Sequence, residues 1–198
     1  ATVNKPDLVD IYVLSMNPEN PNQYRLDGEW RDLEVGEVKL KLKLWGFIPW
    51  SVKREVLRSV HGPALRTEHG VYAIRYAGID EMKQVEQWLA MNKAKNFEEW
   101  RAAVALNHIQ SFNFVYANRH GDIHFIHNAQ LPVRAPGWNW QQYLPGDRSD
   151  LIWQRYHPTS ALPQVTNPES GFVHSANQTP FNITEPQDNP QPSAVPAD

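Results

Sequence analysis

Apolar and charged residues alternate along one run in the first third of the chain. Between residues 37 and 44 the apolar positions are Val38, Leu40, Leu42 and Leu44, and one glutamate and three lysines occupy the others. Successive side chains of a β-strand point to opposite faces, so this run predicts a strand with one buried face and one wet face. Together with a β-branched and aromatic run at residues 10–16 and the turn residues after it, the pattern predicts a meander of antiparallel strands.

The apolar period changes to that of a helix after the meander. Met82, Val85 and Trp88 or Leu89 recur at helical spacing, with Asp80 as the expected N-cap. This spacing predicts a first helix.

A second helix is predicted directly after the first. Asn96 is its expected N-cap, and Glu99 lies three residues later, as in a capping box. Phe97, Trp100 and Val104 share one face of it. Strands and two consecutive helices together make the expected fold class α+β.

A hairpin is predicted after the helices, with strands over residues 111–118 and 122–129 joined by a short turn that contains glycine. Its histidines, His120, His124 and His127, invite a metal-site interpretation. His124 and His127 are an odd number of positions apart on one strand, so they point to opposite faces and cannot share one ion. His120 could join only one of them, and a zinc site needs three or four ligands. We therefore expect no metal site here, only polar residues on a half-exposed hairpin.

Proline is frequent after residue 131, and Trp138, Trp140 and Trp153 lie among the prolines. This composition predicts ordered loops that buried aromatic side chains hold in place. Residues 186–198 contain four prolines and no aromatic residue, which predicts an extended tail.

Composition places the chain among globular proteins. Its 198 residues are 41% apolar, it has no cysteine, and it carries a formal net charge of −3 with basic residues spread along the sequence. We therefore expect no nucleic-acid partner and no membrane partner. The glycine motifs of dinucleotide and phosphate sites, the zinc-protease motif and the nucleophile elbow do not occur in the sequence, and no cofactor is expected.

Four blocks carry the most specific pattern. They are the first thirty residues, the His-Gly-Pro run at residues 61–63, the hairpin with its following Pro-x-Arg at residues 112–134, and the segment at residues 167–181. In this order they resemble the penicillin acylase family of N-terminal-nucleophile hydrolases. Within that family, the resemblance is slightly greater to the branch that acts on N-acyl homoserine lactones and lipopeptides. The resemblance implies an αββα four-layer sandwich, of which the antiparallel sheet, the two helices and the proline-rich loops would form a part.

The resemblance also implies a chemistry. Family members cleave linear amides with an N-terminal serine that a precursor exposes by cutting itself, and the α-amino group of that serine acts as general base. The attack creates an oxyanion, which preorganised donors must stabilise. The resemblance assigns one donor to Asn177, whose side-chain amide donates without titrating. From the residues alone, the alternative for Asn177 is a turn residue before Pro180.

Three further residues receive roles. The resemblance gives Asn113 a structural role near the site. For His61 we expect a structural role at a strand end rather than catalysis. Trp88, on the apolar face of the first helix, could line the substrate's acyl pocket, and core packing is the alternative.

The chain departs from the family at both ends. Ala1 has no nucleophilic hydroxyl, and no arginine follows Arg155, whereas the family has an arginine some tens of residues after the asparagine. We therefore expect an internal piece of an acylase β-chain, inactive by itself, with residues 1–185 as a partial domain and residues 186–198 as the tail. Its partners would be the rest of the β-chain, the α-chain and a small-molecule amide, and the family implies a periplasmic or secreted location.

Such a piece would expose apolar faces that the rest of the enzyme covers, and self-association is one way to cover them. The substrate stays open among β-lactam, acyl-homoserine lactone and lipopeptide side chains. The alternative hypothesis is a non-catalytic binding or interaction domain derived from the same fold. A serine at a processing junction upstream and an arginine downstream in the surrounding reading frame would favour the enzyme.

Overall fold

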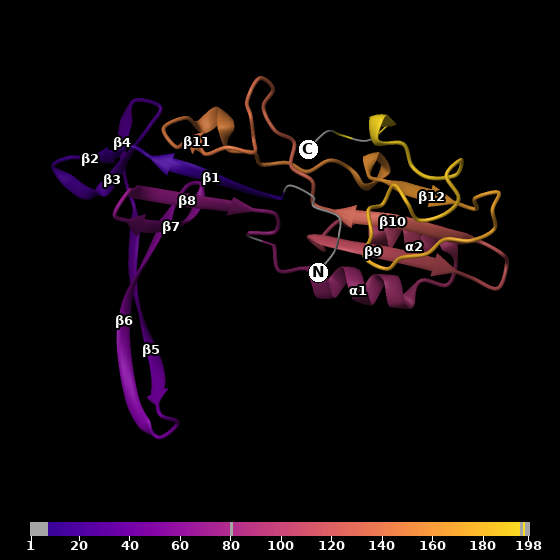
Figure 1. Cartoon of the computed structure of the whole chain (residues 1–198), viewed down its shortest axis with the longest axis horizontal. Coiled ribbons are helices and arrows are strands. Elements are labelled where there is room, and N and C mark those ends of the chain that lie inside the picture. Colours follow the sequence, from indigo (N-terminus) through magenta and orange to yellow (C-terminus); the bar gives the residue numbers. More distant parts are fainter. Residues whose placement is uncertain (1–7, 80, 195, 197–198) are drawn as a thin grey trace. The chain divides into compact units, whose positions relative to one another are not determined.

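The structure is a computed structural model that describes residues 8–79, 81–194 and 196. It divides into two compact units, labelled by element in Figure 1. Unit 1 contains residues 77–133 and the chain from residue 154 onward, together with residue 8, and unit 2 contains residues 9–76 and 134–153. The fold is mixed α+β, with two α-helices and three sheets in the described part of the chain.

Unit 2 is built on a six-stranded sheet with the order β11-β1-β8-β7-β6-β5. Its strands are β1 (Val9–Leu14), β5 (Glu34–Leu44), β6 (Ile48–Ser59), β7 (Gly62–Thr67), β8 (Gly70–Tyr76) and β11 (Leu144–Pro145). All neighbours are antiparallel except β1 and β11, which run parallel. A smaller antiparallel sheet contains β2 (Met16–Asn17), β3 (Asn20–Leu26) and β4 (Glu29–Asp32), and a 3-10 turn, η1, spans Ser149–Leu151. The predicted antiparallel meander is confirmed.

The core of unit 2 joins this meander to the proline-rich loop. Tyr12 is fully buried and donates its hydroxyl to the Leu151 carbonyl at 2.8 Å. The buried Asp10 carboxylate accepts from Trp153 Nε1 at 2.6 Å and from Arg134 Nε at 3.1 Å. The loop is therefore ordered around the buried Trp153, as the sequence predicts, but Trp138 is 38% exposed, so its expected burial is wrong.

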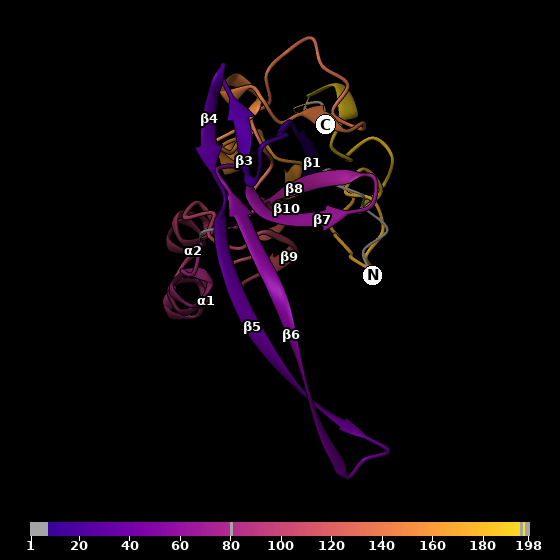
Figure 2. The same ribbon diagram turned by 90° about the vertical axis from the view of Figure 1, so that its left-hand side faces the viewer.

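The sequence predicted that one face of β5 is buried, and this prediction is wrong. Every residue of β5 is exposed, and Leu40, Leu42 and Leu44 are each more than 40% exposed. The alternation of faces is correct, but β7 pairs with β6 only over Leu57–Ser59, so β5 and most of β6 extend beyond the rest of their sheet as a two-stranded ribbon (Figure 2). No layer of unit 2 covers its apolar face.

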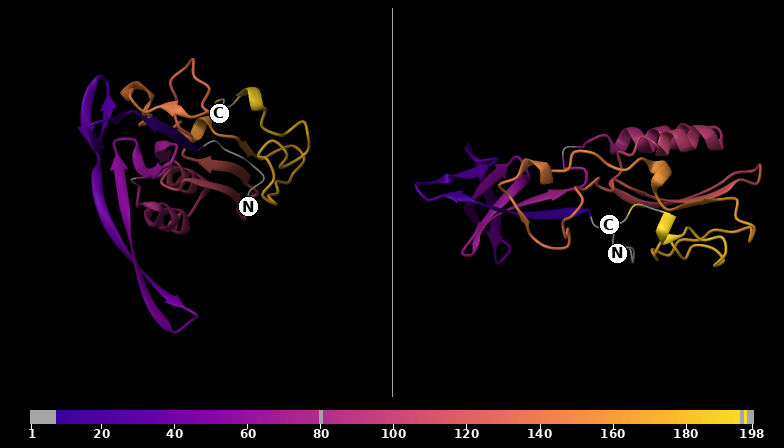
Figure 3. Two further views of the ribbon diagram at one scale, coloured as in Figure 1. Left: turned by 60° about the vertical axis from the view of Figure 1, so that its left-hand side comes forward. Right: turned by 90° about the horizontal axis from the view of Figure 1, so that it is seen from above.

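Unit 1 is built on a three-stranded antiparallel sheet with the order β12-β10-β9. Its elements are α1 (Gln84–Lys93), α2 (Phe97–Val104), β9 (Ser111–Ala117), β10 (Ile123–Ala129), β12 (Gln164–Thr166) and the 3-10 turns η2 (Thr159–Ala161) and η3 (Pro192–Ala194). Within this unit the two helices lie on one face of the sheet and the segment after β12 lies on the other (Figure 3, right). The two consecutive helices and the hairpin are confirmed.

The two helices differ in how well the sequence predicted them. In α2, Asn96 Oδ1 accepts from Glu99 N at 2.8 Å, and the expected apolar face is buried. The expected cap of the first helix, Asp80, lies outside the described residues, and the predicted start is wrong because α1 begins at Gln84 with Lys83 in the N-cap position. The apolar stripe expected on α1 is wrong, because its buried residues are Gln87 and Met91.

The side-chain amide of Gln87 explains that difference. Its Oε1 accepts from the backbone N–H groups of His108 at 2.7 Å and Ile109 at 2.9 Å, and its Nε2 donates to the Val104 carbonyl at 3.2 Å. A buried polar side chain with all these partners costs little to bury. It fixes which face of α1 packs inward.

The boundary expected at residue 185 stays a prediction. Beyond it, Asp188 accepts from the backbone of Ser170 at 2.9 Å and Asn189 accepts from that of Ile183 at 2.8 Å. Over the described ranges, no helix has the length and apolar character needed to cross a bilayer.

Candidate active site

The sheet of unit 1 has two chemically different faces. The register of β9 and β10 places Phe114 opposite Ile126, and both side chains join the core cluster with Trp100 of α2. Side chains alternate along a strand, so Asn113 and His127, which are also paired, point to the other face. That face is the one on which the segment after β12 lies.

A chain of hydrogen bonds runs from this face to the C-terminal segment. His127 Nδ1 lies 2.7 Å from Asn113 Oδ1, and Asn113 Nδ2 donates to Ser175 Oγ at 3.4 Å. The amide nitrogen of Asn113 donates to Ser175, so the atom of Asn113 that faces His127 is the amide oxygen. Because that oxygen can only accept, the Nδ1 atom of His127 carries the proton. The side chains of the hairpin thereby orient the loop that contains Ser175.

His127 is neutral at physiological pH. It is only 4% exposed, and burial lowers the pKa of its imidazole to about 4. The network therefore consists of uncharged donors and acceptors.

Asn177 lies two residues beyond Ser175, with an exposed side chain. Its φ of 60° is in the left-handed region, which asparagine tolerates better than most residues. Gln178 fixes the backbone on both sides, because its Oε1 accepts from Ala176 N and its Nε2 donates to the Asn182 carbonyl at 3.0 Å. Among the residues the structure describes, no hydrogen bond engages the Asn177 amide, so it is available to a ligand.

Side-chain hydrogen bonds hold the rest of this segment in place. Thr184 Oγ1 donates to the Phe172 carbonyl at 2.7 Å and lies 2.6 Å from Ser170 Oγ. The neighbouring Ile183 is fully buried. These bonds and the burial of Ile183 hold the two sides of the loop that presents Asn177 together.

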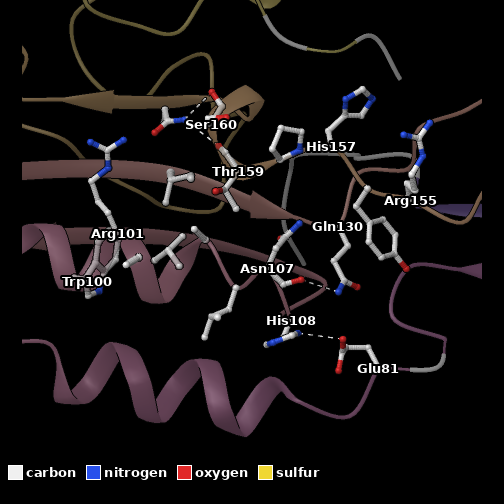
Figure 4. Close-up of a pocket in the computed structure, with 18 of the residues that line it drawn as sticks. Glu81, Trp100, Arg101, Asn107, His108, Gln130, Arg155, His157, Thr159 and Ser160 are labelled. Carbon is white, nitrogen blue, oxygen red and sulfur yellow. Dashed lines mark hydrogen bonds and ion pairs between the residues drawn. The ribbon is translucent and has the colours of Figure 1, made fainter.

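A separate cavity of about 930 Å³ lies on the helix side of the sheet (Figure 4). It is bordered by the C-terminal end of α2, the residues that follow it, and the segment at residues 154–160. Inside it, His108 Nδ1 lies 3.1 Å from Glu81 Oε2, and Gln130 Nε2 donates to the Asn107 carbonyl at 2.8 Å. Arg101 and Arg155 also line it, so the cavity offers charges of both signs. None of the four site residues named from the sequence lines it.

The structure brings two of those four residues into one region. Asn113 bonds to the loop that carries Asn177. Trp88 of α1 packs edge-on against Phe112 and Phe114, with ring centroids 5.7 and 5.4 Å apart, so it lies on the helix face of the sheet, opposite Asn113. A role for Trp88 in an acyl pocket stays a prediction that this placement does not favour.

His61 belongs to unit 2, in the turn between β6 and β7. It is fully buried, its Nδ1 lies 3.3 Å from Ser59 Oγ, and its ring centroid lies 4.6 Å from that of Tyr12. Burial lowers the pKa of its imidazole to about 4. A neutral histidine packed among aromatic rings fits the expected structural role at a strand end.

The expectation of polar residues on a half-exposed hairpin was wrong for His124 and His127, which are buried, whereas His120 in the turn is exposed. His124 is 1% exposed and packs on the helix face, where its Nδ1 lies 2.7 Å from Thr166 Oγ1 and burial lowers its pKa to about 4. His124 and His127 do point to opposite faces, as predicted. Over the described part of the chain, no group of three or more histidine, aspartate or glutamate side chains could hold a metal ion.

The sequence contained a signal for the His127–Asn113 pair. In a hairpin centred on His120, residues equally distant from the centre face each other, and Asn113 and His127 are such residues. Their link to Ser175, 62 residues away from Asn113, has no local signal.

The chain is similar to known proteins in both sequence and fold. The sequence profile of the family described as penicillin amidase matches residues 1–195. Penicillin G acylase from Escherichia coli is 28% identical over 187 residues, and acyl-homoserine lactone acylase PvdQ from Pseudomonas fluorescens is 28% identical over 110 residues. These alignments cover 91% and 52% of this chain but only 21% and 14% of those proteins.

The crystal structure of a thermostable penicillin G acylase from Alcaligenes faecalis superposes with a TM-score of 0.73 at 26% sequence identity. The match covers 97% of this chain and 34% of that one. The present chain thus spans about a fifth to a third of the proteins it matches over most of its length. With a family profile that covers nearly all of it and a fold that matches a solved member, the chain belongs to the penicillin amidase family.

Proposed function

We propose that this chain is part of an amidohydrolase that cleaves the acyl-amide bond of N-acylated small molecules, with Asn177 as a donor to the oxyanion. The observation that carries the proposal is the side-chain amide of Asn177, which is exposed and has no hydrogen-bond partner in the described chain, on a loop that the neutral Asn113–His127 pair helps to anchor. Penicillin G acylase and acyl-homoserine lactone acylase are among the proteins it is similar to.

The reaction needs a nucleophile, and the proposal assigns this role to an N-terminal serine of the complete enzyme. In the proposed enzyme, the hydroxyl of an N-terminal serine encoded outside this sequence attacks the amide carbonyl and gives its proton to the serine's own α-amino group. A free α-amine with a pKa near 7.7 to 8 can accept that proton close to neutral pH. The complete enzyme would have the αββα four-layer arrangement, to which unit 1 would contribute one sheet and one helical layer.

The oxyanion of the tetrahedral intermediate then needs donors that are already in position. An amide N–H of Asn177 would supply one such donor without changing charge. The leaving amine takes the proton from the α-ammonium group, and water hydrolyses the acyl-serine ester to regenerate the enzyme. The acyl group of the substrate belongs to the β-lactam, acyl-homoserine lactone or lipopeptide class.

The remaining expectations are part of the same proposal. The partners would be the rest of the β-chain and the α-chain of one precursor, and the location would be periplasmic or secreted. The 198-residue chain alone would release no amine from such substrates.

The test uses the protein made from the longest reading frame that contains this chain. Release of free amine is measured with a panel of aryl-acyl and fatty-acyl amides, for the unchanged protein and for Asn177→Ala. Losing one oxyanion donor lowers kcat by about 10²- to 10³-fold. The matched control is Asn182→Ala, in the same segment, because the hydrogen bonds of Asn182 within the described chain use its backbone only.

The proposal predicts a large fall in kcat for Asn177→Ala, with only a small drop in the unfolding midpoint because alanine is less favourable than asparagine at a positive φ, and little change in kcat for Asn182→Ala. Full activity of Asn177→Ala would remove this residue from the catalytic set. Absence of amine release from every substrate, with no serine at a processing junction upstream, would instead favour the non-catalytic binding domain.

A further inference from the structure

The loop that carries Asn177 is closed at its base by a backbone hydrogen bond. His174 N donates to the Ile183 carbonyl at 2.8 Å, and Ile183 is fully buried. The two ends of the loop are therefore held together, and its shape between them depends on what bridges its interior. Compact surface loops with joined ends are packed by their own side chains.

One side-chain amide, that of Gln178, bridges the interior of this loop. Its Oε1 atom accepts from the backbone N–H of Ala176, and its Nε2 atom donates to the carbonyls of His174 at 3.3 Å and Asn182 at 3.0 Å. His174 precedes Asn177 and Asn182 follows it, so the amide joins the two sides of the loop. An uncharged amide can make these three bonds at once, because it has an acceptor oxygen and two N–H donors.

Asn177 lies directly between Ala176, which this bridge holds, and Gln178, which forms it. Its φ of 60° is in the left-handed region, which is unfavourable for residues other than glycine, although asparagine tolerates it. A residue keeps such a conformation when the structure around it requires it. The bonds that hold φ also fix the direction in which the Asn177 side chain leaves the loop.

The bond between the loop and the sheet of unit 1 acts at one point only. Asn113 Nδ2 donates to Ser175 Oγ at 3.4 Å, on the N-terminal side of Asn177. Packing contributes little, because Ser175, Ala176 and Asn177 are all exposed. Within the described chain, the bonds of Gln178 are the side-chain bonds that reach the backbone on both sides of Asn177.

We propose that Gln178 is a positioning residue for the oxyanion donor, because its bridge across the loop holds the amide of Asn177 in the orientation that the tetrahedral intermediate requires. The inference rests on the proposed function of Asn177. A donor stabilises the oxyanion only when it is in place before the charge forms, and a displacement of about 1 Å can lower the rate about 100-fold. Gln178 touches neither the substrate nor the nucleophile, and it acts on kcat through Asn177.

The test measures kcat and KM for amine release, with the protein from the longest reading frame that contains this chain. Gln178→Met keeps the length of the side chain and removes all three bonds. Gln178→Glu keeps an acceptor for Ala176 N, but its carboxylate has no donor and repels the two carbonyls. Each change is also made in the Asn177→Ala background.

The matched control is Gln164→Met. The Nε2 atom of Gln164 donates to three carbonyls of a different loop of unit 1, at residues 159–162. This change therefore loosens a loop in the same way, away from Asn177.

We expect Gln178→Met and Gln178→Glu to lower kcat by about 10- to 100-fold with little change in KM, because the lost interaction belongs to the transition state. In the Asn177→Ala background the same changes should lower kcat little further, since the donor that Gln178 positions is already gone. A role in stability alone would lower kcat by the same factor in both backgrounds. Gln164→Met should leave kcat unchanged.

A second measurement does not need activity. The N–H group of Ala176 bonds to Gln178, so in hydrogen–deuterium exchange it should exchange more slowly in the unchanged protein than in Gln178→Met. Gln164→Met should leave this exchange rate as it is.

Three results would overturn the inference: an unchanged kcat in Gln178→Met, an equal further fall of kcat in the Asn177→Ala background, or equal exchange of the Ala176 N–H in the unchanged protein and Gln178→Met. In each of these cases Asn177→Ala by itself still shows whether the proposed function holds. Full activity of Asn177→Ala, or no amine release from any substrate, would instead remove the proposed function and the role of Gln178 with it.

Discussion

Acid should destabilise the folded chain before its carboxylates are protonated, because three histidines are buried in the neutral form. Burial lowers the pKa values of His61, His124 and His127 from 6.5 to about 4 each. Above pH 6.5 neither the folded nor the unfolded chain protonates these groups. Between about pH 6.5 and pH 4 the unfolded chain binds protons that the folded chain does not, so stability is lost as pH falls and the loss ends near pH 4.

The size of the effect follows from the shift of each pKa. A shift of one unit corresponds to about 1.4 kcal/mol, so a histidine that moves from 6.5 to about 4 contributes about 3 kcal/mol over the whole window. Between pH 7 and pH 5 alone the loss is about 2 kcal/mol for each histidine. His124 and His127 together would remove about 4 kcal/mol from unit 1, a large part of the 5–15 kcal/mol that stabilises an ordinary domain.

The assay is urea unfolding at pH 7 and pH 5, followed by tryptophan fluorescence, for the unchanged chain and for His127→Gln. Glutamine cannot titrate, so the loss of stability between these two pH values should be about 2 kcal/mol smaller in the variant. Carboxylates titrate in both proteins and cancel in this difference. His69→Gln is the control, because its side chain is 78% exposed and the Glu68 carboxylate it contacts is 84% exposed.

An identical pH dependence in His127→Gln and the unchanged chain would refute the reasoning. It would mean that the imidazole of His127 reaches water or gains a proton without unfolding, and that the neutral network between His127 and Asn113 is not the one in solution. A pH dependence that also changed in His69→Gln would point to a general charge effect instead.

Three further predictions concern the two cores. Asn96→Ala removes the acceptor for Glu99 N and should lower the free energy of unfolding by about 1 kcal/mol, measured by thermal denaturation. Asp10→Ala removes the buried acceptor shared by Arg134 and Trp153 and should cost about 3–5 kcal/mol in urea unfolding, whereas an unchanged midpoint would show that water replaces the carboxylate. Phe125→Ala, at a fully buried position of β10, should cost about 3–5 kcal/mol by the same measurement, and a loss below 1 kcal/mol would show that the sheet closes over the space.

Local signals predicted the elements whose determinants lie close together in sequence. The capping box of α2 and its apolar face are set by residues within one or two turns. The hairpin of β9 and β10 follows from two apolar runs around a turn in which Gly121 has a positive φ of 96°. In both cases the residues that decide the conformation are neighbours along the chain.

Burial was less predictable, because it depends on what packs against an element. The apolar residues Val85 and Leu89 of α1 are 75% and 52% exposed, while Gln87 is buried because three backbone groups from a distant segment bond to it. The alternating pattern of β5 predicts a strand with one buried face. In the structure β5 extends beyond the rest of its sheet, and no layer of unit 2 packs on its apolar face. Periodicity reports which side chains share a face, and it does not report whether that face is covered.

The candidate site combines features that the sequence could predict with features that depend on long-range packing. A resemblance to the family pointed to Asn177, and the hairpin register contains the His127–Asn113 pair. The bond from Asn113 to Ser175 and the anchoring of the loop depend on contacts between segments about 60 residues apart. Only the fold could bring them together.

The composition of the C-terminal segment explains how a loop without a strand ladder can hold the side-chain amide of Asn177 in position. Prolines remove backbone donors there, and the threonine, serine, aspartate and asparagine side chains supply bonds in their place, as Thr184, Asp188 and Asn189 do. Each of these bonds is between 2.7 and 2.9 Å long and partly buried, so together they limit the motion of the loop as a ladder would. An oxyanion donor is useful only when it is held in position before the charge forms. In the sequence, the polar residues of this segment resemble ordinary turn residues. The proposed role of Asn177 nevertheless depends on the hydrogen bonds that their side chains make.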